Sequence, residues 1–286
     1  MESIFRRNLA SFAENRLAMA SAIVVLLFLV MAVFAPFIAP HDPNATDLFL
    51  RLQPPAWKPG GDWSYILGCD ALGRDILSRI IYGARISMFV GASVVLVATT
   101  IGILAGLAAG FLRGWVDTLI SRVVDILLGF PYLIFAIGLM AMMGPGLINI
   151  ILALVYKEWV IPCRVVRGET LATRELEYVE AARALGASNR HIMMREILPN
   201  ILSPVIVVST IRMAHVIILE ASLSFLGLGV QPPTASWGAM VADGRAFIMQ
   251  AWWVSTFPGI AILLLVLAIN VASQGLRDAF DPRFHE

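Results

Sequence analysis

The sequence has few charged residues and is rich in apolar ones. Only 14% of its 286 residues are charged and 59% are hydrophobic, whereas a soluble domain carries about 25% charged residues. This composition excludes an ordinary soluble protein and favours a membrane protein. The formal net charge is +1, which gives no general attraction to nucleic acid, so we expect no nucleic-acid partner.

Several motifs of enzyme and nucleotide chemistry are missing from the chain. No Gly-Lys dipeptide occurs, which excludes the phosphate-binding loop GxxxxGK[ST]. The four histidines are scattered and show no metal-ligand spacing, and no nucleophile constellation is visible. We therefore expect no cofactor, no metal and no enzyme active site on this chain, and any ATP chemistry must lie on a partner.

The chain has two cysteines, Cys69 and Cys163. The topology argued below places them at opposite membrane faces, too far apart for a disulfide. We expect two free and structurally incidental thiols.

The apolar residues fall into runs long enough to cross a bilayer, which takes roughly 20 residues of helix. The first run, Leu17–Ala39, is longer than the about 7–15 apolar residues of a signal peptide, and Pro36 and Pro40 stand where a cleavage site needs small residues. It is therefore predicted to be an uncleaved span. Five further spans are predicted at Ser87–Phe111, Thr118–Met143, Leu147–Cys163, Ile201–Phe225 and Ser255–Ser273.

These runs predict an all-α integral membrane protein with six transmembrane helices and both termini on one side. Thirteen of the 21 Lys and Arg residues flank that side and six flank the other, while Lys157 and Arg212 lie within spans. Because positive residues concentrate in cytoplasmic loops, we expect both termini in the cytoplasm.

The predicted organisation has five consecutive segments. Residues 1–16 are cytoplasmic, either as a short helix on the membrane surface or as a plain polar lead-in. The others are a first transmembrane helix at 17–39, an external segment at 40–84, a five-helix transmembrane domain at 85–276 with a cytoplasmic loop at 164–199, and a tail at 277–286.

The second predicted span carries small residues at regular spacing. Gly102, Gly106 and Gly110 lie four residues apart and so share one helix face. Lipid gives no hydrophobic drive between helices, so close backbone approach has to supply the packing energy. We expect this face to pack on a neighbouring helix, with a structural role.

The cytoplasmic loop is the most informative segment. Residues 169–185 are strong helix formers, Gly186 is a natural left-handed stop, and Ser188 or Asn189 can cap a second helix that Pro199 closes. This pattern predicts a helix, a glycine turn and a second helix.

A helical hairpin of this kind suits docking into a groove on a partner, although a plain connecting hairpin is the alternative. Small Ala181 and Ala182 would let the partner approach closely, and Glu180 could pair with a basic group on it. Gly186 would set the angle between the two helices.

The loop resembles the "EAA" loop of binding-protein-dependent ABC importer permeases. The matching residues are Glu180-Ala181-Ala182, Gly186 and Leu198-Pro199, while Glu196 departs from an apolar position of the family pattern. The resemblance implies a type I importer permease fold in a bacterial or archaeal cytoplasmic membrane. It also implies that the loop couples the chain to two ATPase subunits, which carry ATP and Mg, and that an external solute-binding protein delivers the substrate.

Other motifs are similar to those of the dipeptide/oligopeptide/nickel permeases, in particular the C-type subunit. These are Leu67-Gly68-Cys69-Asp70, Gly73-Arg74-Asp75, Ser78-Arg79, Tyr82-Gly83-Ala84-Arg85-Ile86-Ser87, Gln231-Pro232-Pro233, Trp237-Gly238, Trp252-Trp253, Phe257-Pro258-Gly259, Gly275-Leu276-Arg277-Asp278 and Asp281-Pro282. Cys69 stands where the family commonly has Thr. The resemblance implies a heterodimer with a homologous B-type subunit, surrounded by membrane lipid.

The same resemblance implies import of dipeptides or oligopeptides, with nickel, glutathione or another small solute as alternatives within the importer class. An ATP-independent secondary transporter is the alternative from another class. Such transporters often show inverted repeats, and no clear pairing of halves is visible here.

Charged residues lie inside two predicted spans. Lys157 and Glu158 are in the fourth, and Arg212, His215 and Glu220 share one side of the fifth, within an arc of about 140° at 100° per residue. Each charge near mid-bilayer costs roughly 2.5–3.5 kcal/mol on insertion scales, so we expect these residues to face protein or water. They either line a translocation pathway or form an ion-paired lock between helices or subunits.

Overall fold

A computed structural model describes residue 12 and residues 14–280 of the chain. Most of the predicted segment 1–16 and the last six residues of the predicted tail 277–286 lie outside the described residues. Within them the backbone is built from helices and loops, with one isolated bridge between Cys69 and Asp75. The helices are α2 (Arg16–Val33), α3 (Ala35–Ile38), η1 (Leu48–Leu50), α4 (Ile76–Leu112), α5 (Gly114–Gly129), α6 (Tyr132–Met143), α7 (Leu147–Glu158), α8 (Val160–Thr173), α9 (Glu177–Ala184), α10 (Asn189–His191), η2 (Ile192–Ile197), α11 (Leu198–Phe225), α12 (Trp237–Arg245) and α13 (Trp253–Phe280).

The described residues contain four helices that are long and apolar enough to span a membrane. They are α2, α4, α13 and the continuous helix Asn189–Phe225, which joins α10, η2 and α11. A fifth is present if α5 and α6, which meet at an angle of 93°, are counted as one span. An all-helical membrane protein is therefore confirmed, with four or five candidate spans by this criterion.

The predicted third span, Thr118–Met143, is broken rather than continuous. Phe130 between α5 and α6 has extended backbone (ψ 136°), as expected for a residue that precedes a proline, here Pro131. The helix therefore stops, and the chain turns before α6 begins at Tyr132.

The predicted fourth span, Leu147–Cys163, is also two helices, α7 and α8, which meet at Trp159. Pro162 has no N–H to donate to the carbonyl of Glu158, so one helical hydrogen bond is missing at this point. Because α8 continues to Thr173, the prediction of one helix over 169–185 is wrong: its first residues belong to α8, and α9 begins separately at Glu177.

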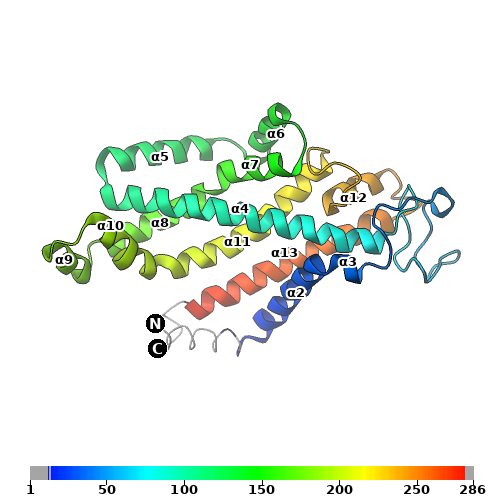
Figure 1. The fold of residues 1–286 in the computed structure, drawn as a ribbon, viewed down its shortest axis with the longest axis horizontal. Coiled ribbons are helices and arrows are strands. Elements are labelled where there is room, and N and C mark those ends of the chain that lie inside the picture. Colours follow the sequence, from blue (N-terminus) through cyan, green and yellow to red (C-terminus); the bar gives the residue numbers. More distant parts are fainter. Residues whose placement is uncertain (1–11, 13, 281–286) are drawn as a thin grey trace.

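The helix α4 runs along most of the long axis of the molecule (Figure 1). Its 37 residues correspond to about 55 Å of helix. It begins at Ile76, earlier than the predicted start at Ser87, because the Asp75 carboxylate accepts a hydrogen bond from the Ser78 N–H at 3.0 Å and caps the helix. The loops before α4 lie at one end of the molecule, and α9 and α10 lie at the other (Figure 1).

The glycine face predicted on the second span packs against α8. A Cβ at Gly102 would lie 2.6 Å from the Pro162 Cβ, and a Cβ at Gly106 would lie 2.6 Å from the Cys163 carbonyl oxygen. At Gly110 the nearest atom, the Thr170 Cβ, would be 2.7 Å away. The predicted packing face is confirmed, since only glycine leaves room for this approach.

Gly106→Leu is therefore expected to destabilise the subunit by at least about 1–3 kcal/mol, the usual cost of overpacking. Thermal unfolding in detergent can be followed by thiol labelling, because Cys69 and Cys163 are at most 1% exposed in the folded chain. Gly168→Leu on α8 is the matched control, since nothing lies within 4 Å of a Cβ there. Equal melting temperatures for the two variants would contradict the close α4–α8 packing.

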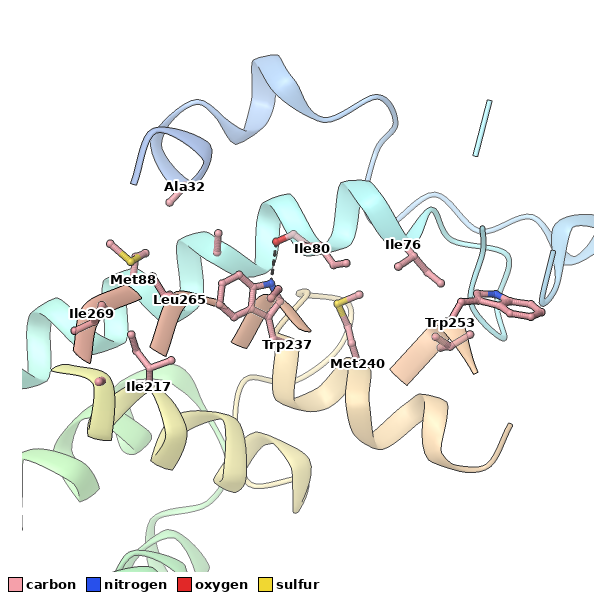
Figure 2. Packing of buried hydrophobic residues seen from close by; sticks show 14 of the residues in the cluster. Ala32, Ile76, Ile80, Met88, Ile217, Trp237, Met240, Trp253, Leu265 and Ile269 are labelled. Atoms are coloured by element: carbon pink, nitrogen blue, oxygen red, sulfur yellow. Dashed lines mark hydrogen bonds between the residues drawn. The ribbon is translucent and has the colours of Figure 1, made fainter. Parts of the chain in front are cut away.

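A hydrophobic core forms where α2, α4, α12 and α13 meet. Trp237 of α12 is fully buried, and its indole N–H donates a hydrogen bond to the Ile80 carbonyl of α4 at 2.9 Å (Figure 2). The ring also meets Phe28 of α2 edge-on, with centroids 5.7 Å apart. A buried tryptophan with a satisfied N–H holds these helices in fixed relative positions.

Candidate functional site

The short helix α9 has one buried side chain, which packs against the rest of the loop. Val179 is fully buried and packs with Ile192 and Ile197 of the following helical segment. Glu177 and Glu180 lie in the first turn of α9, where their negative charge complements the helix dipole. Apart from Val179, α9 presents exposed or half-buried residues.

The turn after α9 is built as predicted. Gly186 has a φ of +82°, in the left-handed region that favours glycine. Its N–H donates to the Arg183 carbonyl at 3.0 Å, and the Ala187 N–H donates to the Ala182 carbonyl at 3.1 Å. The predicted cap is also confirmed, because the Ser188 hydroxyl accepts a hydrogen bond from the His191 N–H at 3.3 Å.

Pro199 does not close the second helix, contrary to the prediction. It lies in the first turn of α11, which continues to Phe225. The preceding turn, Ile192–Ile197, is π-helical, and the Leu198 N–H donates to the Met193 carbonyl five residues back. This wider turn accommodates the proline ring, which would clash with the carbonyl four residues back in a regular helix.

The same wide turn accounts for the unusual position of Glu196. Ile197 is fully buried and takes the apolar packing position, whereas the Glu196 side chain is partly exposed and lies 3.6 Å from the His191 Nε2. One extra residue in the turn shifts the buried position by one place along the sequence.

The predicted coupling residues divide into two groups. Glu180, Ala181, Gly186 and Pro199 are exposed, while Ala182 and Leu198 pack against the core of this end of the molecule. Leu185 is 89% exposed and was missed by the sequence reasoning. A large apolar residue immediately before the glycine stop was the signal available, and in the structure it gives the loop an exposed apolar tip.

A buried ion cluster joins α7 to α11. The Glu158 carboxylate accepts two hydrogen bonds from Arg212, from Nε and from Nη2, both at 2.7 Å. The His215 Nδ1 lies 3.0 Å from the same carboxylate. The side chain of Glu158 is 1% exposed, whereas those of Arg212 and His215 are 20% and 39% exposed. A bidentate pair of this kind fixes geometry as well as charge.

Lys157 is buried beside this cluster but has a different partner. Its ammonium donates to the carbonyl of Phe130, at the break between α5 and α6. It also lies 5.3 Å from the centre of the Tyr132 ring, and that ring meets His215 edge-on. A cation at the carbonyl end of α5 stabilises the broken helix.

Glu220 is separated from the other candidate residues. It is fully buried and accepts hydrogen bonds from Ser224 at 2.8 Å and from Ser87 of α4 at 3.2 Å. Arg212 and His215 therefore turn toward α7, while Glu220 turns toward α4. The geometry matches the predicted lock between helices for Glu158 and Arg212, and a role of the five residues in a translocation pathway stays a prediction.

The motif residues of the segment predicted to be external hold its loops together. The Asp70 carboxylate accepts hydrogen bonds from the Arg74 Nε at 2.6 Å and from the Leu72 N–H at 2.8 Å. Gly73 has a φ of +73°, and a Cβ there would lie 1.7 Å from the Asp47 carbonyl oxygen.

Both cysteines are buried and free. Burial and the carboxylates of Asp75 and Asp70 raise the pKa of the Cys69 thiol to about 12, so it is a poor nucleophile. Residues 12 and 14–280 bring together no group of three His, Cys, Asp or Glu side chains that could hold a metal ion.

Two family models match the chain. Residues 98–286 match the model described as "binding-protein-dependent transport system inner membrane component". Residues 3–55 match the model described as "N-terminal TM domain of oligopeptide transport permease C". The family resemblance that was drawn from the loop and from the other motifs is confirmed.

Several curated relatives are similar over nearly their whole length. The di/tripeptide transport system permease protein DppC of Pseudomonas aeruginosa is 44% identical, over 96% of this chain and 90% of its own. The dipeptide transport system permease protein DppC of Bacillus subtilis is 42% identical, over 94% and 83%. The probable D,D-dipeptide transport system permease protein DdpC of Escherichia coli is 41% identical, over 93% and 88%.

Solved structures show the same fold at low sequence identity. A chain of the MetNI methionine ABC transporter, in an inward-facing conformation, aligns with a TM-score of 0.58 and 19% identity, over 71% of this chain and 97% of its own. A chain of an amino acid ABC transporter aligns with a TM-score of 0.53 and 15% identity, over 68% and 91%.

Proposed function

The chain belongs to the family of binding-protein-dependent transport system inner membrane components, and we propose that it moves dipeptides or oligopeptides into the cell. It is a non-catalytic, multi-pass permease subunit of an ABC importer in the inner membrane. The observation that carries the peptide assignment is the similarity, at more than 40% identity over nearly the whole chain, to permeases named for dipeptides and tripeptides.

The proposed complex has four further components. A homologous B-type permease subunit forms the other half of the membrane pore, two ATPase subunits bind ATP and Mg, and an external solute-binding protein delivers the peptide. The exposed hairpin of α9 and α10 supports the ATPase contact, because Ala181 leaves room for close approach and Leu185 offers an apolar tip.

The proposed topology has six spans with both termini in the cytoplasm. In it α5 with α6 and α7 with α8 each cross the membrane as one broken span. The start of α2 and the end of α13 lie side by side, with Gly275 against Ala18, toward the end of the molecule that carries α9 (Figure 1). Residues 41–82 and 226–252 then face outward and form the docking surface for the binding protein.

The proposed mechanism transmits motion from the ATPases through one continuous helix. ATP binding closes the ATPase dimer and displaces α9, which is held to the subunit by Val179. The displacement passes into the helix Asn189–Phe225, which carries Arg212 against Glu158 of α7. Because Arg212 is paired with Glu158, α11 would carry α7 with it, and this movement would open the translocation cavity to one side of the membrane and close it to the other.

Lys157, Glu158, Arg212, His215 and Glu220 are proposed to set the polarity and the helix contacts of that cavity. The partial exposure of Arg212 and His215 supports contact with a polar solute. Peptides carry a terminal ammonium and a terminal carboxylate, so a path with paired charges suits them.

The substrate assignment is tested by uptake of a radiolabelled dipeptide into intact cells that lack this chain. We expect wild-type chain to restore uptake, and unlabelled dipeptides and tripeptides to compete while Ni²⁺ and glutathione do not. If uptake does not depend on the chain, or if only Ni²⁺ or glutathione competes, the substrate of the importer is another small solute.

A further inference from the structure

A large cavity among the described residues lies between α2, the first turns of α4 and the loop that follows α3. Its volume is about 1190 Å³, larger than the about 300–1,000 Å³ of an ordinary small-molecule pocket. Its lining includes Asp42 and Thr234, one from each of the two segments that are proposed above to face outward. Its wall has an apolar part, with Leu29 and Val33 of α2 and Phe89 of α4, and a polar rim, with Asp42, Asn44 and Arg85.

The polar rim lies at the level of the outer lipid headgroups in the proposed topology. The apolar stretch Ser87–Phe111 of α4 is about 37 Å long as a helix, slightly more than the about 30 Å of bilayer hydrocarbon. Arg85 stands two residues outside this stretch, toward the external end. Phe89 stands one turn further in, at the depth of the first acyl carbons.

The rim offers one cation and one anion to a ligand. Arg85 is exposed, with its guanidinium 5.9 Å from the centre of the Tyr82 ring, and within residues 12 and 14–280 no carboxylate oxygen lies within 4.0 Å of it. Asp42 is exposed, and its carboxylate accepts only the Asn44 N–H, at 2.8 Å, among the described residues. A ligand with a phosphate and an amine could pair with both.

We propose that this cavity binds one outer-leaflet phospholipid whose headgroup carries a phosphate and a primary amine, as in phosphatidylethanolamine. The phosphate pairs with Arg85, the ammonium donates hydrogen bonds to Asp42, and an acyl chain lies along Leu29, Val33 and Phe89. An arginine suits phosphate because its planar guanidinium can donate two parallel hydrogen bonds. The proposal rests on the proposed topology and places a lipid in the groove that α2 and α4 line on their outer side.

The competing occupant is the partner permease subunit, which also presents apolar helices. A helix of a partner would fill the apolar wall but would have to leave Arg85 and Asp42 uncompensated or bring a matching pair of charges. The lipid brings both charges in one headgroup at the correct depth. The cross-linking experiment below distinguishes a bound lipid from a partner helix.

Native mass spectrometry of the purified complex would measure lipid retention after addition of phosphatidylethanolamine, phosphatidylcholine or phosphatidylglycerol. We expect Arg85→Gln to reduce retention of phosphatidylethanolamine by about tenfold or more, as for loss of a charged hydrogen bond. Asp42→Asn should abolish the preference for phosphatidylethanolamine over phosphatidylcholine, whose ammonium has no N–H. Arg122→Gln, at an exposed arginine of α5, is the matched control and should retain the lipid.

A photo-crosslinking amino acid at Phe89, activated in native membranes, gives a second measurement. A phospholipid adduct would support the proposal, and a cross-link to the B-type subunit would overturn it. Competition by free glycerophosphoethanolamine would show that the ligand is a soluble phosphorylated compound and not a lipid. Equal lipid retention by wild type and by Arg85→Gln would show that Arg85 does not bind the headgroup and would overturn the proposed site. Because retention is measured without transport, these outcomes are independent of the dipeptide uptake result.

Discussion

Replacing Ala181 with tryptophan is expected to abolish peptide uptake while the subunit stays folded and inserted. Ala181 is exposed on α9, so the indole ring displaces nothing inside the chain but would occupy the space that a docking partner needs. Loss of about 3 kcal/mol of docking energy, a typical cost at a central contact, weakens association more than a hundredfold. Uptake of a radiolabelled dipeptide and co-purification of the ATPases would measure the two effects together.

Position 181 gives a cleaner test than Gly186. The left-handed φ of Gly186 means that any other residue would strain the turn itself. Ala172→Trp, at an exposed alanine of α8, is the matched control and should retain both uptake and bound ATPase. Full uptake by the Ala181→Trp complex would show that α9 is a plain connecting helix.

Arg212→Met is expected to destabilise the subunit by about 3–5 kcal/mol, the usual cost of removing one member of a buried ion pair. Glu158 would remain with 1% of its side chain exposed and without the two hydrogen bonds of the guanidinium. Since a whole domain is stable by only about 5–15 kcal/mol, the variant should accumulate poorly and unfold at a lower temperature. Thermal unfolding in detergent and the amount of inserted protein would measure the change.

The double variant Glu158→Gln with Arg212→Met separates the two roles considered for this pair. It removes both charges, and we expect it to recover most of the lost stability. If it folds and assembles but does not transport, the pair acts in the pathway as well as in the fold. If it transports normally, the pair is a structural lock and the pathway role is wrong.

The sequence alone predicted the helical membrane fold and, in the loop, the glycine turn and the cap of the second helix. Inside a membrane the backbone polar groups have to be paired within the chain, so long apolar runs form helices there. The left-handed turn at Gly186 and the cap at Ser188 depend on short-range backbone chemistry. The packing face of Gly106 could likewise be predicted, because small residues four apart have few other uses in a membrane helix.

The breaks within two of the predicted spans could not be predicted from hydropathy. An average over many apolar residues is insensitive to a single proline, yet Pro131 and Pro162 each interrupt a helix. The π-helical turn before Pro199 was missed for a related reason, since the proline was taken as a stop although a wider turn can carry it.

The pairing of the charged residues within the predicted spans could also not be predicted from the sequence. Glu158 and Arg212 are 54 residues apart, and their contact depends on how α7 packs against α11. The 140° arc predicted for Arg212, His215 and Glu220 is wide enough to face two neighbouring helices. Glu220 accordingly reaches Ser87 of α4 instead of joining the cluster.

The most direct test of the account is dipeptide uptake by proteoliposomes that contain the purified complex, with ATP available to the ATPase subunits. We expect uptake that requires ATP, the solute-binding protein and this chain together. Uptake by the permease subunits alone, without ATP and driven by an ion gradient, would contradict it and would identify a secondary transporter instead.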